Sequence, residues 1–199
     1  ISADITVCDP PYNVNYVSEH NTDRLHNCEL LNDNLGKDFE SFLQKACYNI
    51  LKVTKGAVYI FMSSSQISTL AKIFEQEGGE LSNILIWVKN QFPLNRSDYH
   101  HQYEPILYGW KKQRYWAGGY DQSNVWFFDK PLSSPLHPTM KPVELLERAI
   151  VNSSKLKSTV LDPFGGSGST LIACENTERK CRMIELEPKY VDITIRRWQ

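Results

Sequence analysis

The sequence predicts an α/β domain with a mostly parallel sheet. Strand-like runs alternate with helix-like segments along most of the chain, which is the pattern of strand–helix–strand units. The run 57–62 is nearly all apolar, as in a strand that is buried on both faces. At 159–168 a strand-like run opens directly into a glycine-rich turn, an arrangement typical of nucleotide-binding folds.

The other elements follow from apolar residues three or four apart for helices and from short apolar runs for strands. Strands are expected at 4–8, 57–62, 84–88, 105–110, 159–162 and 181–185. Helices are expected at 38–52, 67–77, 142–152, 169–175 and 190–198, with Asp38 capping the first and Pro142 opening the third. Two stretches show no period, a polar loop at 13–37 and an aromatic segment at 111–136.

Length and composition favour one soluble domain covering residues 1–199. Of the 199 residues, 41% are hydrophobic and 23% are charged, as in ordinary globular proteins. No apolar run approaches the roughly 20 residues that cross a bilayer, and no signal peptide is visible. The chain opens on Ile1 rather than Met, so we expect residues upstream or a longer parent protein.

The cysteines and histidines give no sign of a disulfide scaffold or a metal site. The five cysteines are scattered, odd in number and never spaced as Cys-x-x-Cys, which favours reduced thiols in a cytosol. His100 and His101 are adjacent, and adjacent residues of a strand point to opposite faces. We therefore expect no bound metal.

The net charge of −1 does not mark a nucleic-acid binder, but the charge is unevenly distributed. Residues 1–50 hold eight acids and three bases, a balance of −5, whereas residues 89–116 hold five bases and two acids, a balance of +3. A local basic face can steer a polyanion even on a neutral protein. A solvated surface loop explains the same charges equally well.

Two prolines follow the first expected strand, in the stretch Asp9-Pro10-Pro11-Tyr12. Proline lacks an N–H and fixes φ, so the strand ends there in a stiff corner. A carboxylate, free backbone carbonyls and an aromatic face are held in one small patch. Such a patch suits a planar amino group, which would find two acceptors for its hydrogens and a ring to stack on.

The glycine-rich turn at 163–168 is followed by a helix of small residues, and Glu185 ends the next strand. Glycines let the backbone approach a ligand, and an acid at the position of Glu185 commonly binds ribose hydroxyls. The turn lacks the third glycine of a dinucleotide fingerprint, and Asp162 would repel a pyrophosphate. The sequence therefore favours an adenosine cofactor without phosphates, such as S-adenosylmethionine, over a turn with no ligand.

Taken together, three motifs resemble those of the amino-group DNA methyltransferases. They are Asp9 to Tyr12, His137 to Pro142, and Asp162 to Thr170 with Glu185. The catalytic motif precedes the cofactor motif, as in the circularly permuted beta-type enzymes. Residues 9–16 and 104–111 are most similar to phage-type DNA modification methylases, in some of which a ParB-like domain precedes the methylase. The resemblance implies a Rossmann-like methyltransferase fold and a cytoplasmic enzyme, bacterial or phage-encoded, of the restriction-modification kind.

The resemblance also implies roles for individual residues. The catalytic set would be Asp9, Pro10, Pro11 and Tyr12, with Asp9 and the Pro10 carbonyl accepting hydrogen bonds from the target amino group and Tyr12 stacking on the base. The cofactor set would be Thr139, Lys141, Asp162, Phe164, Gly165, Gly166, Ser167, Gly168 and Glu185. Within it, Thr139 and Lys141 would bind the methionine carboxylate, and Glu185 the ribose.

The chemistry of such an enzyme requires this arrangement. An exocyclic amine is a poor nucleophile because its lone pair is conjugated into the ring, and two fixed acceptors favour a pyramidal nitrogen that faces the methyl group. Orientation of this kind is worth roughly 7–11 kcal/mol. In double-stranded DNA the target base would have to flip out of the helix. In the family that the chain resembles, an Asp at the position of Asp9 favours adenine N6 as the target. Cytosine N4, an amino group in RNA or a small molecule, and a catalytically silent DNA-binding domain stay open.

Two features depart from the family pattern. Tyr103-Glu104-Pro105 stands where relatives often have His-Glu-Pro, in a region that shapes the base pocket. The segment 111–136, where target recognition is expected, is short. The recognised sequence would therefore be short, or its reading shared with the 13–37 loop. The aromatic residues of 111–136 fit a core role equally well.

Overall fold

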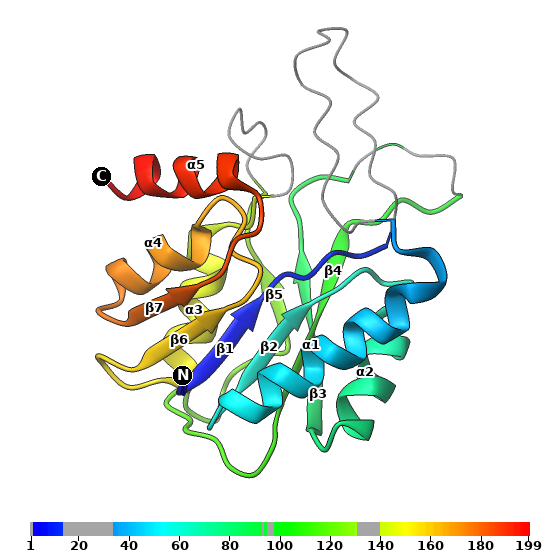
Figure 1. Cartoon of the computed structure of the whole chain (residues 1–199), viewed down its shortest axis with the longest axis horizontal. Helices are drawn as coiled ribbons and strands as arrows, with labels where there is room; N and C mark the ends of the chain where they lie inside the picture. Colours follow the sequence, from blue (N-terminus) through cyan, green and yellow to red (C-terminus); the bar gives the residue numbers. More distant parts are fainter. Residues whose placement is uncertain (1, 14–33, 93, 95–97, 131–139) are drawn as a thin grey trace, which may run out of the picture.

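A seven-stranded sheet separates two layers of helices in the computed structural model, which describes residues 2–13, 34–92, 94, 98–130 and 140–199 (Figure 1). The strands are β1 (Ile5–Cys8), β2 (Val58–Phe61), β3 (Glu80–Val88), β4 (Tyr103–Trp110), β5 (Val125–Phe127), β6 (Thr159–Asp162) and β7 (Lys180–Met183). The helices are α1 (Phe39–Val53), α2 (Ile67–Gln76), α3 (Val143–Ser153), α4 (Ser169–Asn176) and α5 (Pro188–Trp198), with a 3₁₀ turn, η1 (Gly36–Asp38), before α1.

The strands lie in the order β5-β3-β4-β2-β1-β6-β7. Neighbouring strands are parallel except where β4 is involved, because β4 runs antiparallel to both β2 and β3. In the centre, Ile5 and Thr6 of β1 pair with Val160 and Leu161 of β6. The predicted mostly parallel sheet is confirmed. If Asp9 and the glycine turn belong to one site, the strands that precede them are expected to be parallel neighbours, and the pairing of β1 with β6 confirms this expectation.

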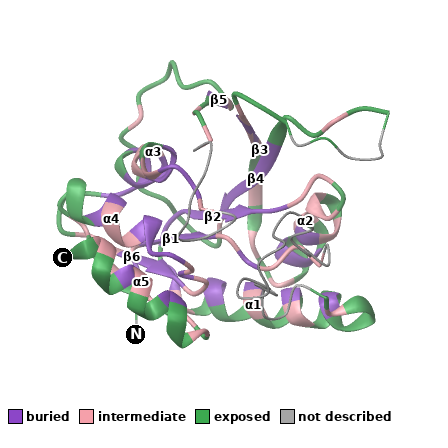
Figure 2. Ribbon diagram, turned by 90° about the horizontal axis from the view of Figure 1, so that it is seen from above, coloured by how far each residue is buried: buried purple, intermediate pink, exposed green. Residues whose placement is uncertain are grey.

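Both faces of the central strands are buried, as the apolar run at 57–62 predicts. Val58 and Ile60 of β2 pack into one apolar cluster with α1 and α2, whereas Tyr59 and Phe61 pack into a second cluster with α3 and α4. Viewed from above, the buried residues concentrate along the sheet between these two helix layers (Figure 2). This alternation of faces is the period of a strand, and it holds the end of β1 rigidly between two cores.

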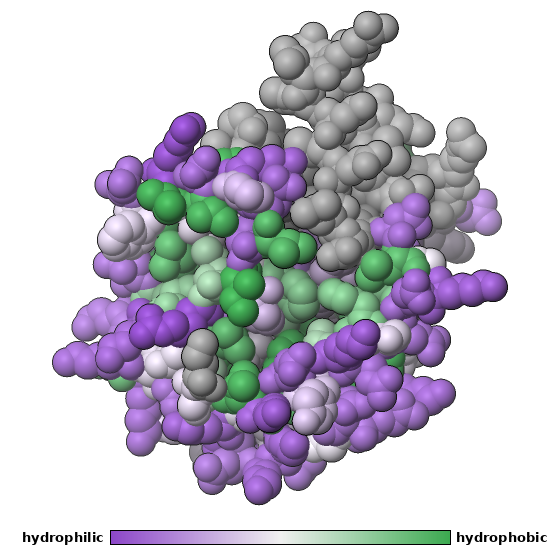
Figure 3. Space-filling model, in the orientation of Figure 1, coloured by the Kyte–Doolittle hydropathy of each residue, from purple (hydrophilic) through white to green (hydrophobic). Residues whose placement is uncertain are grey.

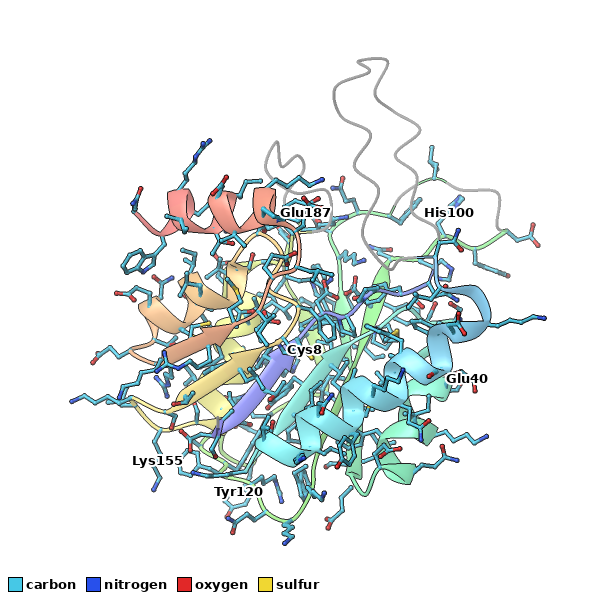
Figure 4. The ribbon with its side chains drawn as sticks, viewed as in Figure 1. Cys8, Glu40, His100, Tyr120, Lys155 and Glu187 are labelled. Atoms are coloured by element: carbon cyan, nitrogen blue, oxygen red, sulfur yellow. The ribbon has the colours of Figure 1, made fainter. Side chains whose placement is uncertain are left out.

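The direction of β4 decides which loops meet at which edge of the sheet. The parallel strands all end at the upper edge in Figure 1, where β4 begins. Residues 111–124 therefore run along the lower edge, where the Ala117 N–H donates to the Asn152 carbonyl at the end of α3 (2.7 Å). Figure 4 shows the same division, with His100 at the upper edge and Tyr120 and Lys155 at the lower edge.

The basic segment 89–116 is consequently not one surface, so a single basic face, one of the two interpretations left open by the sequence, does not hold for its described residues. Lys89 lies at the upper edge and pairs with Glu104, with 3.0 Å between Nζ and Oε2. Arg114 lies at the lower edge, its guanidinium 4.1 Å from the centre of the Trp110 ring. The eight residues of β4 separate Lys89 from Arg114, because the strand runs from the upper edge of the sheet to the lower edge.

The expected insert 111–136 is divided in the same way. Its first part, 111–124, lies at the lower edge, and Trp126 of β5 is buried in the core at 3% exposure. Residues 131–136 lie outside the described residues. The sequence left open whether the aromatic residues of 111–136 belong to the core or to target recognition, and Trp126 belongs to the core.

Two local predictions differ from the structure. Asp38 makes no capping hydrogen bond, because η1 already places it in a helical backbone conformation. The strand β5 was not expected, since three residues are too few to show a period. Where the chain is described, none of its helices is both long and apolar enough to cross a bilayer.

Candidate active site

One pocket at the upper edge collects residues from all three sequence motifs. It is lined by Asp9 and Lys141 on one side and by Asp162, Phe164, Gly166 and Thr170 on the other. The two sides meet because β1 and β6 are neighbours and end together. Figure 4 shows Cys8, which precedes Asp9, at the end of the central strand β1, with Glu187 above it at the start of α5.

Asp9 lies in a cluster of charged side chains drawn from four parts of the chain. Lys141 Nζ donates to Asp9 Oδ2 at 2.5 Å and lies 2.9 Å from Glu104 Oε1. The Tyr12 hydroxyl lies 2.5 Å from Asp9 Oδ1 and 2.7 Å from Glu104 Oε1. Lys89 completes the cluster from the other side of Glu104. Glu104 reaches this site because β4 begins at the upper edge.

Burial and charge shift the ionisation of this cluster in different directions. Burial tends to raise the pKa of Glu104, but the lysines at 141 and 89 outweigh it and lower that pKa to about 2. Burial raises the pKa of Asp9, with Glu104 adding to the rise and Lys141 opposing it. Burial also raises the pKa of Tyr12, as do both carboxylates. Tyr12 is thus a neutral hydroxyl that donates into the cluster.

The glycine turn forms the other wall of the pocket, and its backbone is held tightly. Gly165 approaches β7 so closely that a Cβ would lie 2.3 Å from Met183 Cγ. Gly166 and Gly168 have φ of 52° and 82°, the left-handed region that favours glycine. From α5, Arg197 donates to the Ser167 carbonyl at 2.6 Å. The turn is therefore a rigid backbone cradle rather than a loose loop.

Glu185 is fixed at the rim of this cradle. Its Oε2 accepts the Gly166 N–H at 2.7 Å and its Oε1 accepts the Glu187 N–H at 2.8 Å. Each carboxylate oxygen can accept a second bond, so the pair of oxygens is oriented with capacity left. Ile184 and Leu186 on either side are 60% and 69% exposed, and Figure 3 shows hydrophobic surface on the face that carries β7 and α5. A ligand fits this rim if it carries hydroxyl groups on one ring, for Glu185, and an attached apolar ring, for Ile184 and Leu186.

Asp162 closes the floor of the pocket between the two motifs. It accepts hydrogen bonds from the Thr170 hydroxyl at 2.5 Å and from the Phe164 N–H at 3.0 Å. Burial outweighs these bonds and raises its pKa to about 7. An anionic Asp162 is therefore costly without a nearby cation, which agrees with a positively charged ligand in the pocket.

Replacing Asp162 by Asn should flatten the pH dependence of stability. The folded protein binds the Asp162 proton more tightly than the unfolded chain does, since the pKa rises from 3.8 to about 7. The stability from this group is fully present below about pH 4 and is lost as pH rises through 7. We expect the melting temperature of the wild type to fall more between pH 5 and pH 8 than that of D162N, in thermal unfolding without ligand. Parallel curves for the two proteins would contradict the assignment.

The structure brings most of the predicted residues to this edge. The stiff corner is present, with Pro10 buried and Pro11 and Tyr12 half-buried. Thr139 lies outside the described residues, and its role stays a prediction. Lys141 lines the pocket, but its ammonium bonds Asp9 and Glu104. Sequence reasoning gave no role to Lys89 or Arg197, because neither lies in a motif and both act through contacts between distant segments. Among the described residues, no three potential ligand side chains form a metal site.

The fold and the order of the two motifs define a methyltransferase of the permuted α/β class. Residues 3–196 match the family of DNA methylases of the N6 and N4 type, and the chain belongs to that family. The family predicted from the motifs is therefore confirmed. The type II methyltransferase M.HpaI of Haemophilus parainfluenzae is 31% identical, over 96% of this chain and 67% of that protein. M2.LlaDCHI of Lactococcus lactis subsp. cremoris is 29% identical, over 71% of this chain and 60% of that protein.

Solved structures agree on the fold. The crystal structure of M1.HpyAVI in complex with SAM covers 100% of this chain and 90% of its own, with a TM-score of 0.76 and 25% identity. The cytosine-N4-specific PvuII DNA methyltransferase covers 100% of this chain and 80% of its own, with a TM-score of 0.77 and 16% identity. At that identity the likeness shows the fold alone. The predicted fold class is confirmed.

Proposed function

We propose that this chain is the catalytic domain of a site-specific DNA methyltransferase that uses S-adenosylmethionine to methylate the amino group of a flipped base. The observation that carries the proposal is a pocket in which Asp9 faces the glycine cradle across neighbouring strands. One wall offers hydrogen-bond acceptors to an amine, and the other offers a backbone cradle with an acid at its rim. Adenine N6 is the favoured target, because an Asp opens the catalytic motif.

The cofactor would lie along the glycine turn, with Glu185 on its ribose and the turn 164–168 against its adenosine and methionine parts. When bound, S-adenosylmethionine supplies an electrophilic methyl group on a positively charged sulfonium. Asp162 and Asp9 both line this pocket and provide the negative charge that a sulfonium needs. The neutral rim at Ile184 and Leu186 suits the adenine ring.

Asp9 and the Pro10 carbonyl would hold the target amine. Asp9 Oδ1 and Oδ2 already accept from Tyr12 and Lys141, and each oxygen has capacity for a further bond. Methyl transfer from sulfur to the amine would oblige the amine to lose one proton, and Asp9 would be the base placed to accept it. The hydroxyl bonds of Tyr12 anchor the end of its side chain, which would lower the cost of stacking a flipped base on its ring.

Reading of the DNA sequence is assigned to the upper edge, since the target base must enter there. The described residues of 89–102 lie at this edge and include exposed aromatic side chains, with Tyr99 90% exposed and Phe92 stacked on His100 at 5.2 Å. Residues 111–124 lie at the opposite edge. The insert proposed for recognition would therefore contribute only through its later residues.

A methylation assay on plasmid DNA tests the proposal. With labelled S-adenosylmethionine we expect incorporation into DNA, and mass spectrometry of the digested nucleosides should find N6-methyladenine. N4-methylcytosine instead would keep the enzyme class and overturn the choice of base. Cofactor binding without incorporation into DNA would sink the proposed reaction, and incorporation into RNA alone would move it to another substrate.

A further inference from the structure

Lys141 stands just before α3 and places its ammonium among three oxygen atoms. Nζ lies 2.5 Å from Asp9 Oδ2, 2.9 Å from Glu104 Oε1 and 3.2 Å from the Tyr12 hydroxyl. An ammonium has three N–H donors, so these three acceptors use its full capacity. The side chain is only 8% exposed. A buried lysine in this position is committed to the catalytic corner.

The charges around Lys141 alternate in sign through a series of three ion pairs. Lys89 pairs with Glu104, Glu104 pairs with Lys141, and Lys141 pairs with Asp9. The two carboxylates are close, because both contact the same hydroxyl of Tyr12. Without a cation between them, two such carboxylates do not both stay ionised. Removing Lys141 would leave Asp9 and Glu104 to share a proton.

A proton on Asp9 would remove part of its use as an acceptor. An ionised carboxylate only accepts, whereas a protonated one carries a donor hydrogen in place of an acceptor site. The target amine needs acceptors on Asp9, and so does the proton that it must lose. Resting on the proposed function, we infer that Lys141 is a positioning residue that keeps Asp9 ionised and holds its carboxylate in one orientation toward the pocket.

The other charged groups around Asp9 make this role necessary. Burial raises the pKa of Asp9, Glu104 raises it further, and the Lys141 charge and the hydrogen bonds from Lys141 and Tyr12 lower it. Across the pocket, Asp162 interacts unfavourably with Asp9. Among the described residues, the other cations near the cluster are Lys89, which pairs with Glu104, and Lys130, whose pKa is lowered by burial and then by its two lysine neighbours. Lys141 is the cation bonded directly to Asp9.

Three variants separate this role from a direct contact with the cofactor carboxylate. Lys141→Met removes the charge and keeps the length, and Lys141→Arg keeps the charge. Lys130→Met removes a neighbouring lysine that makes no ion pair with Asp9 or Glu104 among the described residues. The measurements are cofactor affinity by calorimetry, single-turnover methylation of plasmid DNA against pH, and the carboxyl ¹³C titration of Asp9, assigned with Asp9→Asn.

For K141M we expect cofactor affinity within about threefold of wild type and a methylation rate at least about 100-fold lower at pH 7. The loss should shrink as pH rises, because Asp9 then ionises without help. The ¹³C titration of Asp9 should move up by at least about one pH unit. K141R should restore the titration and part of the rate, and K130M should leave both near wild type.

An unchanged Asp9 titration in K141M would overturn the inference. A fall in cofactor affinity with that unchanged titration would instead assign Lys141 to the cofactor carboxylate. The titration needs no DNA, so it reports on Lys141 even if the wild-type protein methylates nothing. Absence of methylation by the wild type would defeat the proposed function and leave the test of Lys141 intact. If circular dichroism shows that K141M does not fold, K141R is measured in its place. The inference expects the Asp9 titration of K141R to match that of the wild type. A shifted titration with normal cofactor affinity would refute a role that depends on the charge alone.

Discussion

Asp9→Ala is expected to abolish methyl transfer while leaving cofactor affinity within about tenfold of wild type. In the proposed arrangement the Asp9 side chain holds the target amine, whereas the cofactor lies against the backbone at 164–168. Removing the carboxylate takes away an acceptor and the nearest base, so we expect a loss of at least about 10³-fold in single-turnover rate. The remaining Pro10 carbonyl cannot orient the amine alone.

Labelled methyl incorporation into plasmid DNA, together with calorimetric cofactor titration, would measure both effects. Asp38→Ala is a matched control, because Asp38 is an exposed aspartate that makes no capping hydrogen bond. It should leave rate and affinity unchanged. Retained transfer in D9A, or equal loss of transfer and binding, would mean that Asp9 does not have the assigned role.

Gly168→Ala is expected to destabilise the fold and weaken cofactor binding together. Gly168 precedes α4 at φ of 82°, and a Cβ there would lie 2.6 Å from Thr194 Cγ2 of α5. The left-handed backbone costs an alanine about 1–2 kcal/mol, and the overlap with a buried side chain adds about 1–3 kcal/mol. Relief of the overlap would pull Thr194 away from the Gly166 carbonyl, to which it donates at 3.2 Å.

Gly36→Ala isolates the backbone part of this effect. Gly36 has a similar positive φ of 53°, but no atom lies within 4 Å of a Cβ built on it. Denaturant unfolding should show a loss of about 1–2 kcal/mol for G36A and roughly twice as much for G168A. Only G168A should lose cofactor affinity. Equal losses in the two variants would show that α5 does not lock the turn.

Much of the fold was accessible from local patterns. The apolar run at 57–62 predicted a buried strand, because burial on both faces requires apolar residues. The glycine-rich turn after 159–162 predicted one wall of the pocket, because positive φ favours glycine. The positions of the predicted helices agree with α1 to α5 to within a few residues at their ends. The adjacency of β1 and β6 followed from the need to place two motifs at one pocket.

The direction of β4 could not be predicted from local patterns. The alternation of side chains along a strand is the same for either direction of the chain, and the orientation of the strand depends on how the loops before and after it cross the sheet. That one reversal delivers Glu104 to the catalytic corner and sends Arg114 to the far edge. The partners of Lys141 were equally hidden, since Asp9 is 132 positions away in sequence.

The seam between β1 and β6 has a consequence for the ancestry of the chain. In the proposed arrangement, the residues that hold the amine come from before residue 130, apart from Lys141, and those that hold the cofactor come from after residue 140. The pairing of β1 with β6 and the bond from Lys141 to Asp9 join these two parts of the chain. Pairing across a ladder does not depend on which segment is translated first. A gene that encoded the two halves in the opposite order could therefore build the same pocket, provided that its linker spanned the same gap.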